Sequence, residues 1–273
     1  MISISFSSCL LTLFWSSIMI LLFSFLLKCE LAKHNIGLSF LLFFSFLTVI
    51  RLMTPFEFRY TIALISTKVL PFIQYLLFYP VFHGRLYVYQ LLLTGWIAGL
   101  LRNILITGKR YYHFQKFLKA SFLPLSEETA HYADILKKIH CPQYMIDSCR
   151  FVRSHIVTTP AVTGWLKPVI LLPELDFTDQ ELEFIFMHEW THFRHLDLFW
   201  KSFLGILHMT FWWNPFIVLL LHKAEEAIEL KVDKAATRNL TYYQKIEYLE
   251  CIIKIQKHQM SLTHPSPFTF AFS

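Results

Sequence analysis

Long apolar runs dominate the first 110 residues of the chain. Apolar residues cover about positions 2–27 and 86–106, and each run is long enough to cross a bilayer as a helix. A shorter run covers about positions 36–50. We predict three transmembrane helices from these runs, within a membrane region that extends over residues 1–108.

A fourth apolar stretch, residues 61–82, is harder to interpret. Lys68, Pro71 and Pro80 interrupt it. A charged side chain and two prolines disfavour a regular helix in lipid, so we expect a segment lying at the membrane surface. A further span stays open as the alternative.

The basic residues orient the predicted spans. No positive charge precedes the first run, and Lys28 directly follows it. The third run is followed by a basic cluster, Lys109, Arg110, Lys116 and Lys119. Because loops rich in Lys and Arg face the cytoplasm, the N-terminus is expected outside and the chain after residue 108 inside.

From residue 121 the pattern becomes that of a soluble α+β domain. Residues 126–140 are polar and compatible with a helix, whereas Arg150–Ile156 and Val169–Leu172 are typical of short strands. The turn at residues 164–168 is expected to join two strands. We predict a domain over residues 109–250 and a tail over 251–273. A free sheet edge here could pair with an extended peptide, or could serve packing alone.

A capped helix follows these strands. Thr178 and Glu181 have the spacing of a capping box, and apolar residues follow without Gly or Pro. We therefore expect His188 and His192 to lie on one helix. At four residues apart, their side chains share a face and can bind one metal ion.

The segment from His188 to His192 reads His-Glu-x-x-His. In this pattern Glu189 can act as a general base towards water activated by the metal. A chain with 13 histidines could contain the pattern by chance. The capped helix favours the functional interpretation, but a third ligand is still required.

Glu229 and Asp233 supply a candidate ligand and its support. They lie four residues apart on a predicted helix, so Glu229 can bind the metal while Asp233 accepts a hydrogen bond from a ligand histidine. A continuous helix from His192 to Glu229 would extend about 55 Å and separate them. Asn214-Pro215 interrupts this helix. We predict a hairpin over residues 196–221 that dips into the membrane as a continuation of the motif helix.

Composition supports a membrane protein and excludes other classes. The chain is 55% hydrophobic and only 16% charged, with a net charge of +6. The basic residues show no aromatic interleaving of the kind that binds nucleic acid, so we expect contacts with anionic lipid and no direct nucleic-acid binding. The five cysteines are scattered without a Cys-x-x-Cys pair, which gives no disulfide framework or cysteine zinc site.

The order of several motifs resembles the BlaR/MecR-type membrane metallopeptidases, the antirepressor family that includes bacterial β-lactam sensor-transducers. The resemblance covers about residues 156–236 and is more specific than the zinc motif alone. The segments that carry it are Thr159–Gly164, Pro168–Pro173, His188–His192, Asp197, Asn214-Pro215, and Glu229 with Asp233.

The resemblance implies a gluzincin-like zinc site facing the cytoplasm of a multi-pass bacterial membrane protein. His188, His192 and Glu229 would bind Zn²⁺, and Glu189 would be the catalytic base. Asp233 would support a ligand histidine, and Asp197 would be structural near the site. The implied substrate is a cytoplasmic protein, either a transcriptional repressor or the enzyme itself. The short tail after residue 250 leaves no room for a sensor domain, so we do not expect this chain to sense β-lactams directly, and a separate sensor partner stays open.

Two other functions stay open. A membrane quality-control or prenyl-processing zinc protease also combines His-Glu-x-x-His with a membrane hairpin and Glu-x-x-x-Asp. A non-catalytic signal transducer or scaffold would need no base at Glu189.

The sequence does not identify the group that stabilises the oxyanion. His208 and His222 are candidates, although histidines in such positions more often serve packing, and His195 lies about 10 Å along the helix from His188, too far to share its metal.

Overall fold

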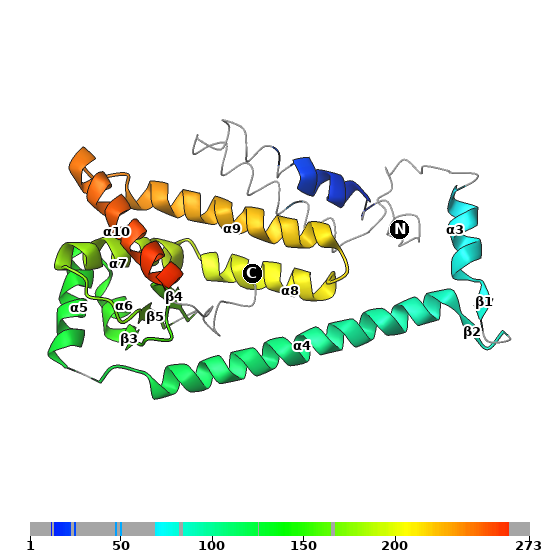
Figure 1. Cartoon of the computed structure of the whole chain (residues 1–273), viewed down its shortest axis with the longest axis horizontal. Helices are drawn as coiled ribbons and strands as arrows, with labels where there is room; N and C mark the ends of the chain where they lie inside the picture. Colours follow the sequence, from blue (N-terminus) through cyan, green and yellow to red (C-terminus); the bar gives the residue numbers. More distant parts are fainter. Residues whose placement is uncertain are drawn as a thin grey trace. The chain divides into compact units, whose positions relative to one another are not determined.

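The computed structural model describes residues 69–81, 84–124, 126–164 and 167–261, together with residues 12, 14–22, 25, 47 and 50. These residues are mainly helical, as predicted, and the strands among them are short (Figure 1). From residue 69 the elements are α3 (Val69–Leu77), β1 (Pro80–Val81), β2 (Leu86–Tyr87), α4 (Val88–Ala120), α5 (Glu127–Lys138), α6 (Gln143–Ser148), β3 (Arg150–Arg153), β4 (Ala161–Thr163), β5 (Val169–Leu172), α7 (Asp179–Arg194), α8 (Asp197–Thr210), α9 (Pro215–Ala236) and α10 (Tyr242–Ser261).

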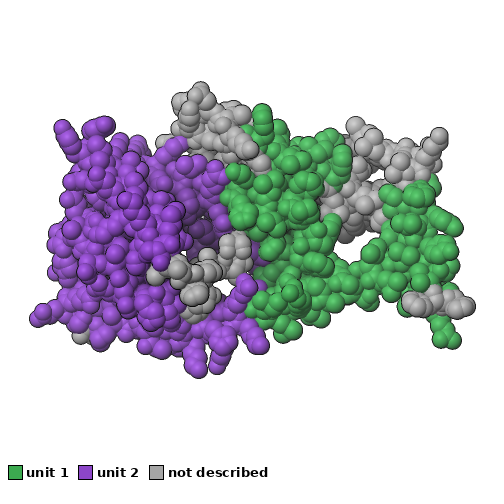
Figure 2. Space-filling view, viewed as in Figure 1, with its two compact units in different colours: residues 1–106, 207–224 green, residues 107–206, 225–273 purple. Residues whose placement is uncertain are grey.

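The chain divides into two compact units (Figure 2). Unit 1 combines residues 1–106 with residues 207–224, and unit 2 combines residues 107–206 with residues 225–273. The chain passes from one unit to the other within helices α4, α8 and α9, so each of these helices contributes residues to both.

Helix α4 is, among the described residues, the one helix long and apolar enough to cross a membrane. Its 33 residues extend about 50 Å, whereas a bilayer core needs about 30 Å. The predicted span 86–106 covers β2 and the first part of α4, and the helix continues without a break to Ala120. The basic cluster therefore lies on the same helix. Of the predicted span 2–27 the structure describes residues 12, 14–22 and 25, which are helical, and of the span 36–50 it describes residues 47 and 50. The rest of both spans lies outside the described residues.

The segment predicted at the membrane surface, residues 61–82, is described only from residue 69. It contains the nine-residue helix α3, on which Phe72 and Tyr75 are exposed. Strand β1 follows and pairs antiparallel with β2.

Helices α8 and α9 are separated by a break at Asn214-Pro215, which confirms the predicted interruption. The Oδ1 atom of Asn214 accepts a hydrogen bond from the backbone N–H of Phe216 at 3.0 Å, so Asn214 caps α9 and Pro215 begins it. In unit 1, the indole N–H of Trp96 on α4 donates to the carbonyl of Thr210 at 2.9 Å. Helix α4 is thereby bonded to the last residue of α8.

Unit 2 contains a three-stranded sheet in the order β3-β5-β4. Strand β3 runs parallel to β5, and β4 runs antiparallel to it. The turn from Gly164 connects β4 to β5, and this glycine has a φ of 92° that other residues rarely adopt. Both predicted strands are present, although the first ends at Arg153 instead of Ile156. Strand β4 was not predicted.

The two faces of this sheet pack against different helices. Side chains alternate along each strand, so neighbouring residues of β3 and β5 enter opposite cores. One core combines Phe151, Ile170 and Leu172 with residues of α5, α7 and α10, including Tyr132, Leu182, Phe186 and Cys251. The other combines Val152, Val169 and Leu171 with Phe114 and Leu118 of α4.

Helix α10 extends across the position where the sequence predicted the end of the domain. The expected tail, residues 251–273, begins in the middle of this helix, and its described part is helical up to Ser261. Cys251 is 3% exposed and belongs to the core of unit 2. This part of the chain therefore packs as an integral helix of the unit.

Candidate metal centre

Helix α7 begins with the predicted capping box. The backbone N–H of Glu181 donates to Thr178 Oγ1 at 3.2 Å, and the Glu181 carboxylate accepts from the Thr178 N–H at 2.8 Å. Lys254 of α10 contacts both carboxylate oxygens of Glu181 at 2.9 and 2.8 Å. The start of α7 is therefore fixed locally by its cap and over a long range by α10.

The two motif histidines lie on α7 as predicted. Leu182, Ile185 and Phe186 are buried in the core of unit 2, while His188 and His192 line a cavity. All of the residues that line this cavity belong to unit 2. The amphipathic pattern of α7 thus orients the histidines away from the core.

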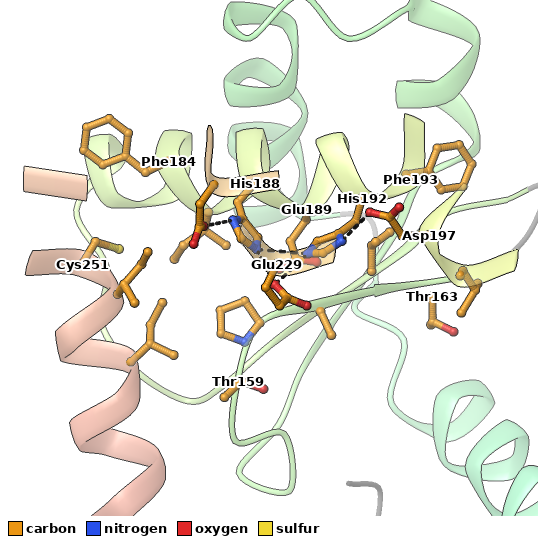
Figure 3. Close-up of a pocket in the computed structure, with 18 of the residues that line it drawn as sticks. Thr159, Thr163, Phe184, His188, Glu189, His192, Phe193, Asp197, Glu229 and Cys251 are labelled. Carbon is orange, nitrogen blue, oxygen red and sulfur yellow. Dashed lines mark hydrogen bonds and ion pairs between the residues drawn. The ribbon is translucent and has the colours of Figure 1, made fainter. Parts of the chain in front are cut away.

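Three donor atoms converge in this cavity (Figure 3). His188 Nε2 and His192 Nε2 lie 3.1 Å apart, and Glu229 Oε2 of α9 lies 3.6 Å from the first and 3.3 Å from the second. In a tetrahedral zinc site, neighbouring ligand atoms are separated by about 3.3 Å. The three side chains therefore fit a zinc ion in both chemistry and spacing, and could hold one.

The electrostatics of the cavity favour positive charge between these side chains. Burial alone would lower the pKa of His188, but hydrogen bonds with Asp233 and Glu229 raise it to about 10. Burial likewise opposes the shift at His192, where hydrogen bonds with Asp197 and Glu229 raise the pKa to about 9. The pKa of Glu229 is lowered by both histidines despite its burial. Protons or a metal ion can supply this positive charge.

His192 is held by Asp197. Its Nδ1 atom lies 2.8 Å from Asp197 Oδ2, and the two side chains are only 10% and 5% exposed. Helix α7 ends at Arg194, and Leu196 then adopts a φ of 57° before α8 begins at Asp197. The prediction that the motif helix continues into the hairpin is therefore wrong. The chain turns at Leu196, and this turn directs the Asp197 carboxylate to His192.

His188 is held by two side chains from other helices. Its Nδ1 atom lies 3.2 Å from Asp233 Oδ1 on α9 and 2.8 Å from Tyr248 Oη on α10. Tyr248 also donates to Asp233 Oδ1 at 2.7 Å. Tyr248 was not predicted. It lies 60 residues from His188, and no motif in the sequence connects the two.

Two further side chains contribute to the polar part of the cavity. Glu189 is 6% exposed and lies next to the paired histidines (Figure 3). Lys201 Nζ lies 3.2 Å from Glu229 Oε1, which leaves Oε2 directed towards the histidines. Lys201 was also not predicted, because its partner Glu229 lies 28 residues away on another helix.

The cavity has a volume of about 580 Å³. Residues 159–164 line one part of it, and Ile252, Ile255 and Gln256 of α10 line another. Strand β4 lies at the edge of the sheet, and among the described strands it pairs with β5 alone. A sheet edge therefore adjoins the three donor atoms.

The other histidines considered from the sequence lie elsewhere. His195 caps the C-terminal end of α7 and is not part of the donor group, and its Nδ1 atom is buried without a hydrogen-bond partner among the described residues. His208 and His222 do not line the cavity. Within the described residues, neither is in position to act on a group bound there.

Comparison with known proteins gives one family. A family model described as "BlaR1 peptidase M56" matches residues 83–268. The regulatory protein BlaR1 of Bacillus licheniformis is 28% identical over 125 residues, which cover 44% of this chain and 21% of that protein. The methicillin resistance mecR1 proteins of Staphylococcus aureus and Staphylococcus epidermidis are 26% identical over 176 residues, which cover 61% of this chain and 28% of those proteins. The chain thus spans between about a fifth and three tenths of the length of these relatives.

Proposed function

Because the chain belongs to the BlaR1 peptidase M56 family, we propose that it is a membrane-embedded zinc metalloendopeptidase that cleaves a cytoplasmic protein. The observation that carries the proposal is the convergence of His188, His192 and Glu229 beside the buried Glu189. A purely structural zinc site is usually closed by four protein ligands and has no use for a base. Three ligands with an adjacent carboxylate support a catalytic site.

Zinc, when bound, would lower the pKa of water towards about 7 and polarise the scissile carbonyl. Proton transfer and the orientation of the zinc ligands would come from the protein's own side chains. Glu189 would take a proton on its carboxylate from the attacking water and then deliver it to the leaving amine. Asp197 would orient the imidazole of His192, and Lys201 would keep Glu229 turned towards the histidines through its other oxygen.

The edge of β4 is the proposed binding surface for the substrate. An extended peptide can add to a free sheet edge through backbone hydrogen bonds, and β4 lines the cavity that contains Glu189. Such pairing would hold the substrate backbone in an extended form next to the zinc ligands. This supports cleavage within a polypeptide chain over hydrolysis of a small molecule.

We further propose that the site faces the cytoplasm. Helix α4 is long enough to cross the membrane, and its basic residues, which include Lys109 and Arg110, follow the apolar part. The hairpin of α8 and α9 would dip into the same bilayer and return, which keeps Glu229 on the side of His188. A topology reporter fused after residue 240 should therefore be cytoplasmic, and an extracellular reporter would overturn this orientation.

The family and the names of the relatives support a role in regulation. One of these is a regulatory protein and others are methicillin resistance proteins. We propose that this chain cleaves a transcriptional repressor, itself, or both, in a signalling response that a separate sensor partner could initiate. Direct binding of nucleic acid is not part of this function.

The test compares Glu189→Gln with wild type and with Glu250→Gln, a matched acid-to-amide change at an exposed position of α10. Glu189→Gln should retain zinc in the purified protein and lose cleavage by at least about 100-fold, because the general base is absent. Cytoplasmic fragments that accumulate only with wild type and Glu250→Gln would identify the substrate. Full cleavage by Glu189→Gln would refute the mechanism, and a wild type without zinc or cleavage would favour a non-catalytic transducer.

A further inference from the structure

Tyr248 has an unusual position for a residue of the last described helix. It is 3% exposed, and its ring packs edge-to-face against Phe184 with 5.8 Å between ring centroids. Its hydroxyl lies between two polar groups of the metal centre, 2.8 Å from His188 Nδ1 and 2.7 Å from Asp233 Oδ1. No motif in the sequence assigns it a role.

The direction of these hydrogen bonds follows from the chemistry of the groups. His188 Nε2 faces the other two donor atoms. If a metal ion binds to Nε2, the proton of the neutral imidazole lies on Nδ1, which is then an N–H donor. The single hydroxyl proton of Tyr248 is donated to the Asp233 carboxylate, which can only accept when ionised. The lone pairs of Oη then accept from His188. His188 therefore donates to Tyr248, and Tyr248 donates to Asp233.

We propose that Tyr248 is a positioning residue of the metal centre, which fixes the ring of His188 and connects it to Asp233. This inference rests on the proposed function, because it assigns the residue to the same zinc site. The direct contact between His188 Nδ1 and Asp233 Oδ1 is longer, at 3.2 Å. Tyr248 therefore provides the shorter hydrogen bond to Nδ1 of His188 and fixes the orientation of its ring.

Two other roles for Tyr248 fit the geometry less well. As a donor to a developing oxyanion, it would have to direct its proton into the cavity, but that proton is already bonded to Asp233. As a packing residue, it would need only its ring, and phenylalanine would serve equally. The two polar contacts distinguish a positioning role from packing, and the change from Tyr to Phe tests this difference directly.

The experiment uses the full chain in detergent, with Tyr248→Phe, Asp233→Asn and the double variant. Tyr243→Phe is the matched control, because Tyr243 lies on the same helix and is 78% exposed. Zinc affinity is measured by competition with a chelator, and the site geometry by the visible absorption of the cobalt-substituted protein. Cleavage is measured at saturating zinc to separate kcat from KM.

Tyr248→Phe should weaken zinc binding about 10-fold, alter the cobalt spectrum and lower kcat with little change in KM. In the double variant the losses should be less than additive, because both residues act on one hydrogen-bond chain. Tyr243→Phe should match wild type. Wild-type zinc affinity and an unchanged cobalt spectrum in Tyr248→Phe would overturn the proposal while leaving the proposed function intact. A wild-type chain that binds neither zinc nor cobalt would overturn both.

Discussion

The two histidines of the motif share one helix but are held in different ways. His192 is bonded to Asp197, which lies five residues later in the chain across the turn at Leu196. His188 is bonded to Asp233 and Tyr248, which come from α9 and α10. The local side of the centre, His192 with Asp197, is therefore built by residues close together in the sequence. The distant side, His188 with Asp233 and Tyr248, forms only when distant helices pack against α7.

The two sides also differ in their access to water. The side chain of Asp197 is 5% exposed, whereas that of Asp233 is 42% exposed. A buried charged hydrogen bond is screened less, and its loss leaves a donor that water cannot easily reach. The local side should therefore tolerate substitution poorly, and the distant side should tolerate it better because Tyr248 and water can replace a lost partner.

Asp197→Ala should have the largest effect. It leaves the Nδ1–H of His192 buried without an acceptor, so we expect zinc affinity to fall about 100-fold and the free energy of unfolding to fall by about 2–3 kcal/mol. Chelator competition and denaturant unfolding measure these changes. Asp179→Ala, at the exposed start of α7, should cost less than about 1 kcal/mol. Equal effects of the two substitutions would contradict the importance of the local side.

Asp233→Asn should have a smaller effect on the same measurement. The amide oxygen can still accept from Tyr248, and Tyr248 can still accept from His188. We expect zinc affinity to fall about 10-fold. A loss as large as that of Asp197→Ala would show that the distant side is not the more tolerant one.

The metal-free protein should lose stability at high pH. The folded pKa values of His188 and His192, about 10 and 9, lie above the unfolded value of about 6.5. The stabilisation from these groups is therefore complete below about pH 6.5 and is lost as the pH rises through 9 to 10. Thermal unfolding with a chelator between pH 6 and 10 should show a falling Tm.

Asp233→Asn should reduce the part of the decrease in Tm that comes from His188. Asp197→Asn should reduce the part that comes from His192. Zinc-loaded protein should not show the fall, because its ligand imidazoles are already neutral. A Tm of the metal-free protein that stays constant over this range would contradict the raised pKa values of both histidines.

The sequence predicted the parts of the site that depend on neighbouring residues. The capping box of Thr178 and Glu181 specifies where α7 begins, and Asn214-Pro215 specifies where the hairpin breaks. In both cases the signal and the structure lie within a few residues of each other. The spacing of Glu229 and Asp233 was informative for the same reason.

The parts that escaped prediction depend on tertiary packing. Leu196 is neither Gly nor Asn, so nothing in its identity indicated a positive φ at the end of α7. Strand β4 is three residues long and exists through its pairing with β5. The role of α10 was missed because its contacts reach α7 from 60 or more residues away, through Tyr248 and Lys254.

The convergence of His188, His192 and Glu229 has a consequence for the mechanics of the chain. A bound ion would act as a cross-link between α7 and α9, closing a loop of about 40 residues that includes the whole hairpin. Because the donor site exists only in the folded chain, the binding free energy of the ion would add to the stability of the folded state. The ion would then resist any separation of α7 from the base of the hairpin, in the way a disulfide would in an oxidising compartment.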